Sequence, residues 1–165
     1  MSAPRPLAIR RLEAAGIAFS VHRFPESIRS AAEVADALGI EPDRVLKTLV
    51  IEETPRRGHP YLLMVPATLT VDLKALAREL GVKRLRMAAH VEAERLTGLR
   101  VGGISALSLA GKGFRILVDR SVTDHEHVLV SAGERGIDIE LRPSDLIRVT
   151  GAVTVKVVGL AEPTH

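Results

Sequence analysis

Short apolar runs follow one another along the chain, and most of them have the alternation or the β-branched content that is typical of strands. In one run, Ile17, Phe19 and Val21 alternate with more polar residues, and the run Val45–Ile51 is apolar except for a lysine and a threonine. Together these runs predict strands over Ile17–Phe24, Val45–Ile51, Tyr61–Val65, Lys83–Met87, Phe114–Asp119, Val128–Val130, Ile137–Leu141 and Ala152–Val158.

Apolar residues at helical spacing predict the helices, and a glycine follows most of them as a stop signal. Ser30 and Glu33 form a capping box, in which each side chain satisfies a free N–H group at the start of a helix. The expected helices cover Pro6–Ala15, Ser30–Leu38, Val71–Leu80, His90–Thr97 and Pro143–Val149. Because helices and strands mix irregularly, we expect an α/β (or α+β) fold on a mixed sheet, with residues 1–165 as one domain.

The composition limits the chemistry that is available to the chain. Its 165 residues suffice for one sizeable core, which is expected to be aliphatic because only 2% of the residues are aromatic. The absence of cysteine excludes a disulfide, a thiolate metal site and a cysteine nucleophile within this sequence. No apolar run approaches the roughly 20 residues of a membrane helix, and the segment Met1–Pro6 has no apolar signal region. We therefore expect a cytoplasmic protein with no membrane partner.

The charge balance is mildly basic. The net charge of +3 is compatible with contact to a nucleic acid, but only a clustered basic face would be evidence for it. The scarcity of aromatic residues argues against a broad stacking platform for single strands. The run Asp124–His127 contains two histidines and two acids, but no third metal ligand is evident, so neither a metal nor a cofactor is expected.

A glycine-rich stretch, Gly98–Ala106, stands among apolar residues rather than in a polar loop. Gly102 and Gly103 permit backbone angles and close approaches that other residues do not, and the N–H groups of such a turn can converge on an anion or a polarised carbonyl oxygen. The stretch matches neither the Walker A motif nor the complete dinucleotide fingerprint. Spacing alone favours a tight turn between two buried strands.

Two further stretches carry charges at unusual places. Lys47 is the one charged residue of an apolar strand; it either extends outward from an edge strand or projects a cation into a pocket, and the residues leave both interpretations open. Asp138 and Glu140 follow a glycine-rich turn and share one face of their strand. That face is either the solvated side of an antiparallel strand or a carboxylate beside the same pocket as Lys47.

Three stretches, in this order and spacing, resemble the YbaK/ProX family of aminoacyl-tRNA deacylases, which is related to the editing domain of bacterial prolyl-tRNA synthetase. They are Val45–Leu49, Val101–Ser105 and Ser131–Leu141, and the resemblance extends from about Leu7 to Leu146. It implies a compact α/β domain with a mixed, barrel-like sheet flanked by helices. It also implies an enzyme that hydrolyses the ester between a wrong amino acid and the 3′-terminal adenosine of tRNA.

By this resemblance Lys47 matches the lysine needed for activity, Gly102 and Gly103 match the glycine motif that lines the pocket, and Asp138 matches a nearby aspartate. Substrate contacts are expected from Phe24, Thr48, Ile104 and Ser105. The implied partners are the acceptor end of a mischarged tRNA, above all tRNA(Pro) carrying cysteine, alanine or serine, and prolyl-tRNA synthetase. Water or a group of the substrate itself fits this residue set better as nucleophile than Ser105 does, since no histidine stands in a recognisable triad context.

The sequence departs from the family pattern at Ala106, where relatives usually have proline. Proline would fix the exit of the turn, so its loss leaves the pocket shape and the amino-acid specificity open. Two alternatives to the deacylase therefore remain: a non-catalytic tRNA-binding module on the same fold, and an esterase for small molecules. Neither the oligomeric state nor the edited amino acid can be derived from the sequence.

Overall fold

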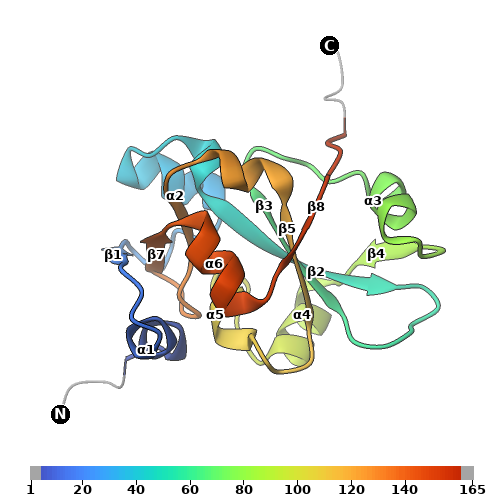
Figure 1. Cartoon of the computed structure of the whole chain (residues 1–165), viewed down its shortest axis with the longest axis horizontal. Coiled ribbons are helices and arrows are strands. Elements are labelled where there is room, and N and C mark those ends of the chain that lie inside the picture. Colours follow the sequence, from blue (N-terminus) through green and yellow to red (C-terminus); the bar gives the residue numbers. More distant parts are fainter. Residues whose placement is uncertain (1–4, 161–165) are drawn as a thin grey trace.

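The computed structural model describes residues 5–160 as helices packed around two β-sheets (Figure 1). Residues 1–4, which belong to the segment in which the sequence shows no apolar signal region, and residues 161–165 lie outside the described residues. The elements in chain order are α1 (Leu7–Ala14), β1 (Ser20–Arg23), α2 (Ala31–Leu38), the 3₁₀ turn η1 (Pro42–Arg44), β2 (Leu46–Glu53), β3 (Tyr61–Pro66), α3 (Leu73–Leu80), β4 (Leu85–Met87), α4 (His90–Thr97), α5 (Ala106–Leu109), β5 (Arg115–Asp119), the 3₁₀ turn η2 (Arg120–Asp124), β6 (Val128–Ser131), β7 (Ile137–Leu141), α6 (Pro143–Thr150) and β8 (Val153–Val155).

The larger sheet has, within residues 5–160, five strands in the order β4-β2-β3-β5-β8. Strands β2 and β3 form an antiparallel hairpin, whereas β5 pairs in parallel with both β3 and β8. Strand β4 pairs with β2 only at Ile51, Glu52 and Glu53. The first half of β2 therefore pairs with a neighbouring strand on one side only, and its other edge is free.

The smaller sheet is antiparallel, with the order β1-β7-β6 among the described residues. A parallel bridge between Val45 and Leu129 joins it to the larger sheet at the start of β2. The mixed α/β class expected from the sequence is confirmed, and the expected single barrel-like sheet is resolved into two sheets that meet along β2 and β6.

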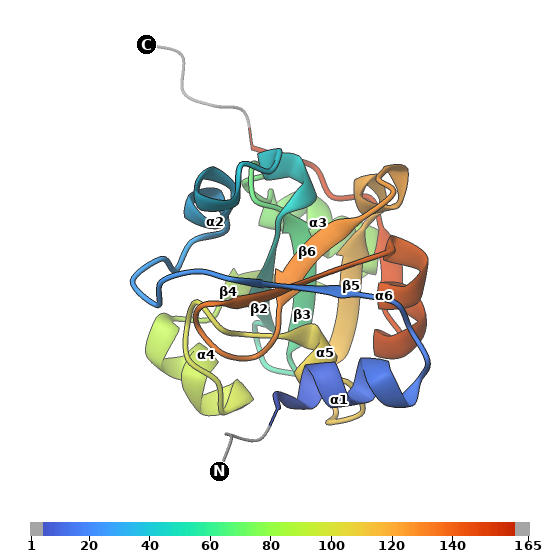
Figure 2. The same cartoon turned by 90° about the vertical axis from the view of Figure 1, so that its left-hand side faces the viewer.

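Alternation along β3 divides the interior into two apolar layers. Leu62 and Met64 belong to the larger layer, and Leu63 and Val65 belong to the layer on the opposite face. Helix α3 covers the second face through residues such as Leu76, while α1, α4, α5 and α6 contribute to the first. Figure 2 shows α3 behind the sheet and α1, α5 and α6 on the other side of it.

The structure corrects the expectation that Gly98–Ala106 turns between two buried strands. Residues 98–105 connect helix α4 to helix α5, a short helix that the sequence patterns did not reveal because four apolar and small residues are too few to show a helical period. Strands β1 and β8 are shorter than expected, because only Ser20–Arg23 and Val153–Val155 find a partner strand.

Helix ends otherwise follow the sequence signals. Ser30 accepts a hydrogen bond from the N–H of Glu33, as the capping box predicts. The Glu33 carboxylate accepts from the Ser30 hydroxyl and not from the Ser30 N–H, so the second bond of the capping box is replaced by one between the side chains. Asp72 caps α3 in the same way by accepting from the N–H of Ala75. Within residues 5–160, none of the helices has the length or the apolar run required to span a bilayer.

Candidate functional site

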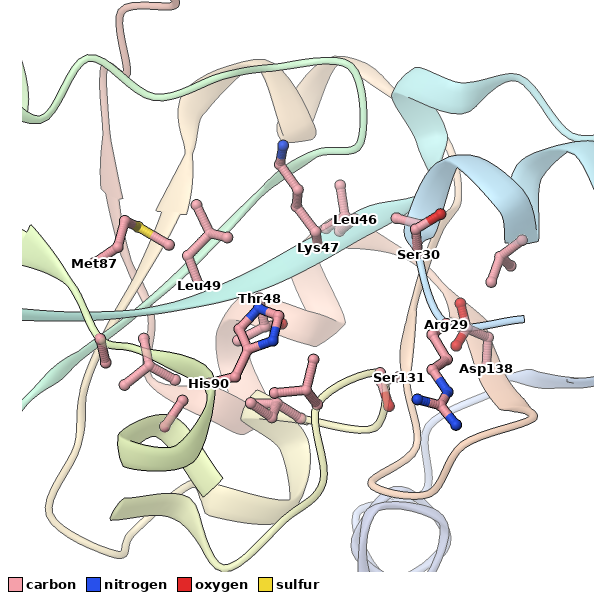
Figure 3. Close-up of a pocket in the computed structure, with 18 residues that line it drawn as sticks. Arg29, Ser30, Leu46, Lys47, Thr48, Leu49, Met87, His90, Ser131 and Asp138 are labelled. Carbon is pink, nitrogen blue, oxygen red and sulfur yellow. The ribbon is translucent and has the colours of Figure 1, made fainter. Parts of the chain in front are cut away.

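A cavity of about 250 Å³ opens along the free edge of β2, at the residues beyond the reach of β4 (Figure 3). Its walls come from the loop before α2, from α2 itself, from β2, from the β4–α4 segment and from the β6–β7 hairpin. The remaining wall is the glycine loop, by which we mean residues 98–105 between α4 and α5. The lining residues are Arg29, Ser30, Ala31, Val34, Leu46, Lys47, Thr48, Leu49, Val50, Met87, Ala88, His90, Ala93, Val101, Gly102, Ile104, Ser131 and Asp138.

Both faces of β2 contribute to this cavity. Lys47 is paired with Val65 and Thr48 with Met64, so their side chains leave the strand on opposite faces of the sheet. Both nevertheless line the cavity, because it wraps around an edge that no neighbouring strand covers. A backbone edge of this kind also presents N–H and C=O groups that are free to bind a ligand.

Lys47 is half-buried in this wall. Its partial burial lowers the pKa of the ammonium group, because the charged form loses hydration. Within residues 5–160 the Lys47 side chain makes no hydrogen bond and no ion pair. Figure 3 shows its Nζ directed away from the Asp138 carboxylate. The ammonium group is therefore available to an anionic or polarised group of a ligand.

Asp138 lies on β7, with only 6% of its surface exposed. Burial raises the pKa of its carboxyl group to about 6. The nearby charge of His22, which is the residue opposite Asp138 on the neighbouring strand β1, partly opposes that rise. Opposite Asp138 on the other side of β7 stands Ser131, whose hydroxyl accepts a hydrogen bond from the N–H of Gly133 over 3.2 Å. The site thus contains a carboxylate that is ionised at neutral pH but poorly hydrated.

A network of charged side chains lies on the same face of the smaller sheet as Asp138. His22 Nε2 lies 2.8 Å from the Glu140 carboxylate, and Arg44 donates to the other oxygen of Glu140 over 3.1 Å. Arg44 also donates to the carbonyl oxygen of His127. Glu140 shares a strand face with Asp138, as expected, but it is engaged in this network and does not line the cavity.

The glycine loop is held against the β6–β7 turn. A Cβ atom on Gly103 would lie 3.0 Å from the backbone nitrogen of Arg135 and 3.0 Å from the carbonyl carbon of Glu134, so any other residue would have to displace this backbone. Arg135 Nε donates to the carbonyl oxygen of Val101 over 2.7 Å, and the Glu94 carboxylate accepts from the N–H of Val101 over 2.8 Å. These contacts hold two segments that are distant in the sequence at one corner of the cavity.

The loop supplies backbone donors beside the cavity. Gly102 has a φ of +93°, a left-handed conformation that favours glycine. The N–H of Gly103 is occupied, since it donates to the carbonyl oxygen of Arg100 over 2.8 Å. The N–H groups of Gly102 and Ile104 make no hydrogen bond within the described part of the chain, and both residues line the cavity.

The structure brings five of the eight expected site residues to the cavity wall: Lys47, Thr48, Gly102, Ile104 and Asp138. Gly103 lies behind the wall at the contact with Arg135. Phe24 packs instead against the small apolar cluster around Val34 and Leu129. The role expected of Phe24 in substrate binding stays a prediction.

Ser105 is also behind the wall, with 1% of its surface exposed, and its hydroxyl caps α5 by accepting from the N–H of Ser108. A substrate contact by Ser105 likewise stays a prediction. Ala106, the residue at the position of the family proline, is the first residue of α5 and is 2% exposed.

Sequence reasoning missed several residues of the cavity, among them Arg29, Ser30, His90 and Ser131. The pairing of Ser131 with Asp138 was accessible in principle, because a short turn between two strands fixes which residues face each other. Arg29, Ser30 and His90 had no such signal, since they reach the cavity from loops and helix starts that only the folded chain brings to β2.

The run Asp124–His127 does not gather around a metal position. His125 Nε2 lies 3.7 Å from an Asp43 carboxylate oxygen, and within residues 5–160 no three histidine or acidic side chains come together as a ligand set. The cavity combines cationic groups, such as the Lys47 ammonium, with the Asp138 carboxylate, and this combination suits a zwitterionic or polar organic ligand.

Comparison with known proteins agrees with this geometry. The model of the aminoacyl-tRNA editing domain family matches residues 25–149. EbsC of Enterococcus faecalis (strain ATCC 700802 / V583), a proposed Cys-tRNA(Pro)/Cys-tRNA(Cys) deacylase, is 32% identical over 145 residues, which cover 87% of each chain.

Solved structures show the same architecture. The hypothetical protein APE2540 superimposes with a TM-score of 0.82 at 25% identity, covering 92% of this chain and 98% of the other. A proposed trans-editing enzyme for prolyl-tRNA synthetase superimposes with a TM-score of 0.76 at 28% identity, covering 94% and 98%. The matched family segment contains the whole cavity, from Arg29 to Asp138, and on this evidence the chain belongs to the family of aminoacyl-tRNA editing domains.

Proposed function

We propose that this protein is a free-standing deacylase that hydrolyses the ester between a mischarged small amino acid and the 3′-terminal adenosine of tRNA. The observation that carries the proposal is that Lys47, which has no charged partner, and the poorly hydrated Asp138 line the same small cavity in an editing-domain chain. Their opposite charges match the two charged or polarised ends of an aminoacyl ester.

Asp138 is proposed to bind the α-ammonium group of the amino acid. A carboxylate with a pKa of about 6 is ionised at pH 7, and its low exposure strengthens the attraction to a bound cation. Ser131, the residue paired with Asp138 on the neighbouring strand β6, offers a hydroxyl to the same group or to a ribose oxygen.

Lys47 and the glycine loop are proposed to act on the ester itself. The Lys47 ammonium group attracts the ester carbonyl oxygen or a terminal phosphate, and the N–H groups of Gly102 and Ile104 donate to the oxyanion as it forms. Water attacks the carbonyl carbon, the bond to the ribose oxygen breaks, and that oxygen takes up the proton that the water gives up, so that free amino acid and uncharged tRNA are released. Where the thiol of a cysteinyl ester attacks instead, the ribose oxygen takes up the thiol proton and leaves, and water then hydrolyses the thiolactone to free cysteine.

The finer specificity that we propose is for cysteine on tRNA(Pro), with alanine and serine as related substrates. Two observations support it: the name of the EbsC relative, and a cavity volume of about 250 Å³, which suits a small side chain. The apolar side chains of Leu46, Val50 and Ile104 suit a small, weakly polar group such as a thiol or a methyl.

Deacylation of a panel of tRNA(Pro) charged with cysteine, alanine, serine or proline tests this function. We expect selective hydrolysis of one wrong amino acid, and we expect Lys47→Met to lower its rate by roughly 10²–10³-fold, the usual effect of losing one electrostatic contact to the reacting group. Lys74→Met, on the exposed side of α3, is the matched control and should leave the rate unchanged.

The remaining outcomes separate the alternatives. Salt-dependent tRNA binding with no turnover on any charged species would identify a binding module. Equal cleavage of free aminoacyl esters and of aminoacyl-tRNA would identify a small-molecule esterase. Full activity of the folded Lys47→Met variant would remove Lys47 from the mechanism and leave the deacylase assignment standing.

A further inference from the structure

Three arginines gather beside the cavity without neutralising partners of their own. Arg29 comes from the loop before α2, Arg100 from the glycine loop and Arg135 from the β6–β7 turn. Within residues 5–160 none of the three forms an ion pair. Other arginines, such as Arg78, also have none, and what distinguishes these three is that they lie together beside the cavity.

The three side chains are close in space although they are far apart in the sequence. Arg29 packs on the glycine loop, since a Cβ atom on Gly102 would lie 3.2 Å from the Cβ of Arg29. Arg135 binds the same loop through the carbonyl oxygen of Val101. The charges of Arg100 and Arg29 help to lower the pKa of Arg135, after its loss of hydration, while Glu94 and Glu26 oppose this effect.

The nearby acids Glu94 and Glu26 form no ion pair with these guanidinium groups within residues 5–160. Glu94 accepts from the N–H of Val101, and no ion pair joins Glu26 to an arginine among the described residues. Arg29 and Arg100 are exposed, and Arg29 also lines the cavity, on the same side as Ser131 and Asp138 in Figure 3. A cluster of like charges that is maintained next to a binding cavity is stabilised when a polyanion binds there.

We infer that Arg29, Arg100 and Arg135 form the phosphate-binding surface for the single-stranded 3′ end of tRNA, next to the cavity that takes the amino acid. This inference rests on the proposed function, because it places the ester in the cavity. The RNA strand that carries the ester must leave the cavity past its wall. Arg29 packs on that wall at Gly102 and Arg135 binds it at the neighbouring Val101, while Arg100 belongs to the same loop. Guanidinium groups bind phosphate oxygens with paired hydrogen bonds, which makes arginine well suited to this task.

The surface also agrees with the scarcity of aromatic residues. With 2% aromatic residues in the chain, base stacking contributes little, and affinity for a single strand must come from its phosphates. Such binding is insensitive to base sequence and sensitive to salt.

Binding of an uncharged acceptor-stem minihelix RNA that ends in single-stranded CCA tests the inference, measured at several salt concentrations. We expect Arg29→Gln and Arg100→Gln each to weaken binding roughly tenfold at low salt and to lower the slope of log affinity against log salt by about 0.7, the value for one phosphate contact on a single strand. Arg78→Gln, an exposed arginine on α3, is the control with the same charge change and should bind like the unaltered protein.

The same minihelix without its terminal CCA locates the contact. If the arginines bind the 3′ end, the two variants and the unaltered protein bind this shortened RNA equally. An unchanged affinity and slope in both variants, an equal loss in Arg78→Gln, a defect that persists without CCA, or no RNA binding by the unaltered protein would each overturn the inference.

Hydrolysis is measured separately, so the two proposals can fail independently. The arginine variants should lose part of the preference, in kcat/KM, for charged tRNA over 3′-aminoacyl-adenosine, which lacks the phosphates. If the protein hydrolyses charged tRNA but this preference does not change, the arginine surface is wrong and the deacylase stands. If RNA binding follows the arginines but no charged tRNA is hydrolysed, the surface stands and the deacylase is wrong.

Discussion

Two ionisable side chains at the cavity carry charges that burial makes less favourable than they would be in free solution. Burial raises the pKa of Asp138 and lowers that of Lys47, in both cases because the charged form loses water. Both charges therefore lower the folding stability of the ligand-free protein. Each becomes favourable when a ligand group of opposite charge binds beside it. Stability and activity should respond in opposite directions to changes at these residues.

Asp138→Asn should stabilise the folded protein at neutral pH while removing substrate affinity. The pKa rises from 3.8 to about 6 on folding, and a shift of about two units corresponds to roughly 3 kcal/mol as an upper estimate. Because the folded pKa is raised, the stabilisation by the bound proton is complete below about pH 3.8 and is lost as the pH rises through about 6. Thermal unfolding at pH 5 and pH 8 measures this: the unaltered protein should lose stability between the two values more than Asp138→Asn does.

The same titration should appear in the rate. If the Asp138 carboxylate binds the α-ammonium group, deacylation falls as the pH drops below about 6, because the carboxyl group becomes neutral. A pH–rate profile of kcat/KM checks this. A profile without an inflection near that pH would contradict the role of Asp138 and would leave the stability prediction untouched.

At the scale of the elements, the glycine loop and the β6–β7 turn act as one unit. Their contact is made by backbone against backbone at Gly103, so a side chain cannot give way there. The loop also begins α5 through the Ser105 cap, and the next residue is Ala106, where the family resemblance leads us to expect proline. The exit of the loop is therefore fixed by a hydrogen bond in place of a ring.

Gly103→Ala should reduce activity sharply, because its Cβ would force apart two backbone segments now 3.0 Å from that position. We also expect a stability loss of roughly 1–3 kcal/mol from overpacking. Gly111→Ala is the matched control: it has a left-handed φ of +77° but open space around it, so it should cost about 1 kcal/mol of stability and no activity. Urea unfolding and deacylation assays measure both effects, and equal activity losses in the two variants would refute the steric argument.

Ala106→Pro should fold and retain the specificity of the unaltered protein. Position 106 is the first residue of α5, where proline is tolerated because its N–H has no partner within the helix. Its side chain does not line the cavity, so the spectrum of hydrolysed amino acids should stay the same, and stability should rise by about 0.4–1 kcal/mol if the ring fits. A changed preference on the charged tRNA(Pro) panel would show that the family proline sets specificity.

At the scale of the whole molecule, two sheets must be held together for the cavity to exist, since Lys47 belongs to one and Asp138 to the other. The backbone bridge between Val45 and Leu129 is one link. Arg44 is another, because it reaches from the turn before β2 to Glu140 on β7 and to the carbonyl oxygen of His127 before β6.

Arg44→Met should therefore loosen the junction of the sheets. Its loss removes two hydrogen bonds, one of them to a partly buried carboxylate, and should destabilise the fold by roughly 1–3 kcal/mol. Arg148→Met removes an ion pair within α6 whose arginine is 67% exposed, and it should change stability by less than about 0.5 kcal/mol. Urea midpoints of the two variants distinguish a link between sheets from a generic loss of charge, and equal midpoints would contradict the proposed role of Arg44.

Local patterns were sufficient for most of the fold. Apolar runs located the strands, the capping box located the start of α2, and glycines located the ends of α2, α3 and α4, because each of these signals depends on residues a few positions apart. The patterns failed at α5, which is too short to show a period, and at the ends of β1 and β8, where the available partner strand sets the length. Lys47 and Asp138 stood out in the sequence as charges in apolar strands.

What the sequence by itself determined is thus the succession of elements, their caps and the residues with anomalous charge, since these follow from neighbours in the chain. Only the tertiary structure decided which edge of β2 stays unpaired, that Lys47 and Thr48 reach one cavity from opposite faces, and that Asp138 is buried enough to raise its pKa. The tertiary structure alone also decided that Arg29, Arg100 and Arg135 lie close together. Burial and proximity depend on the packing of segments that are separated by tens of residues, and no local pattern of side chains encodes that packing.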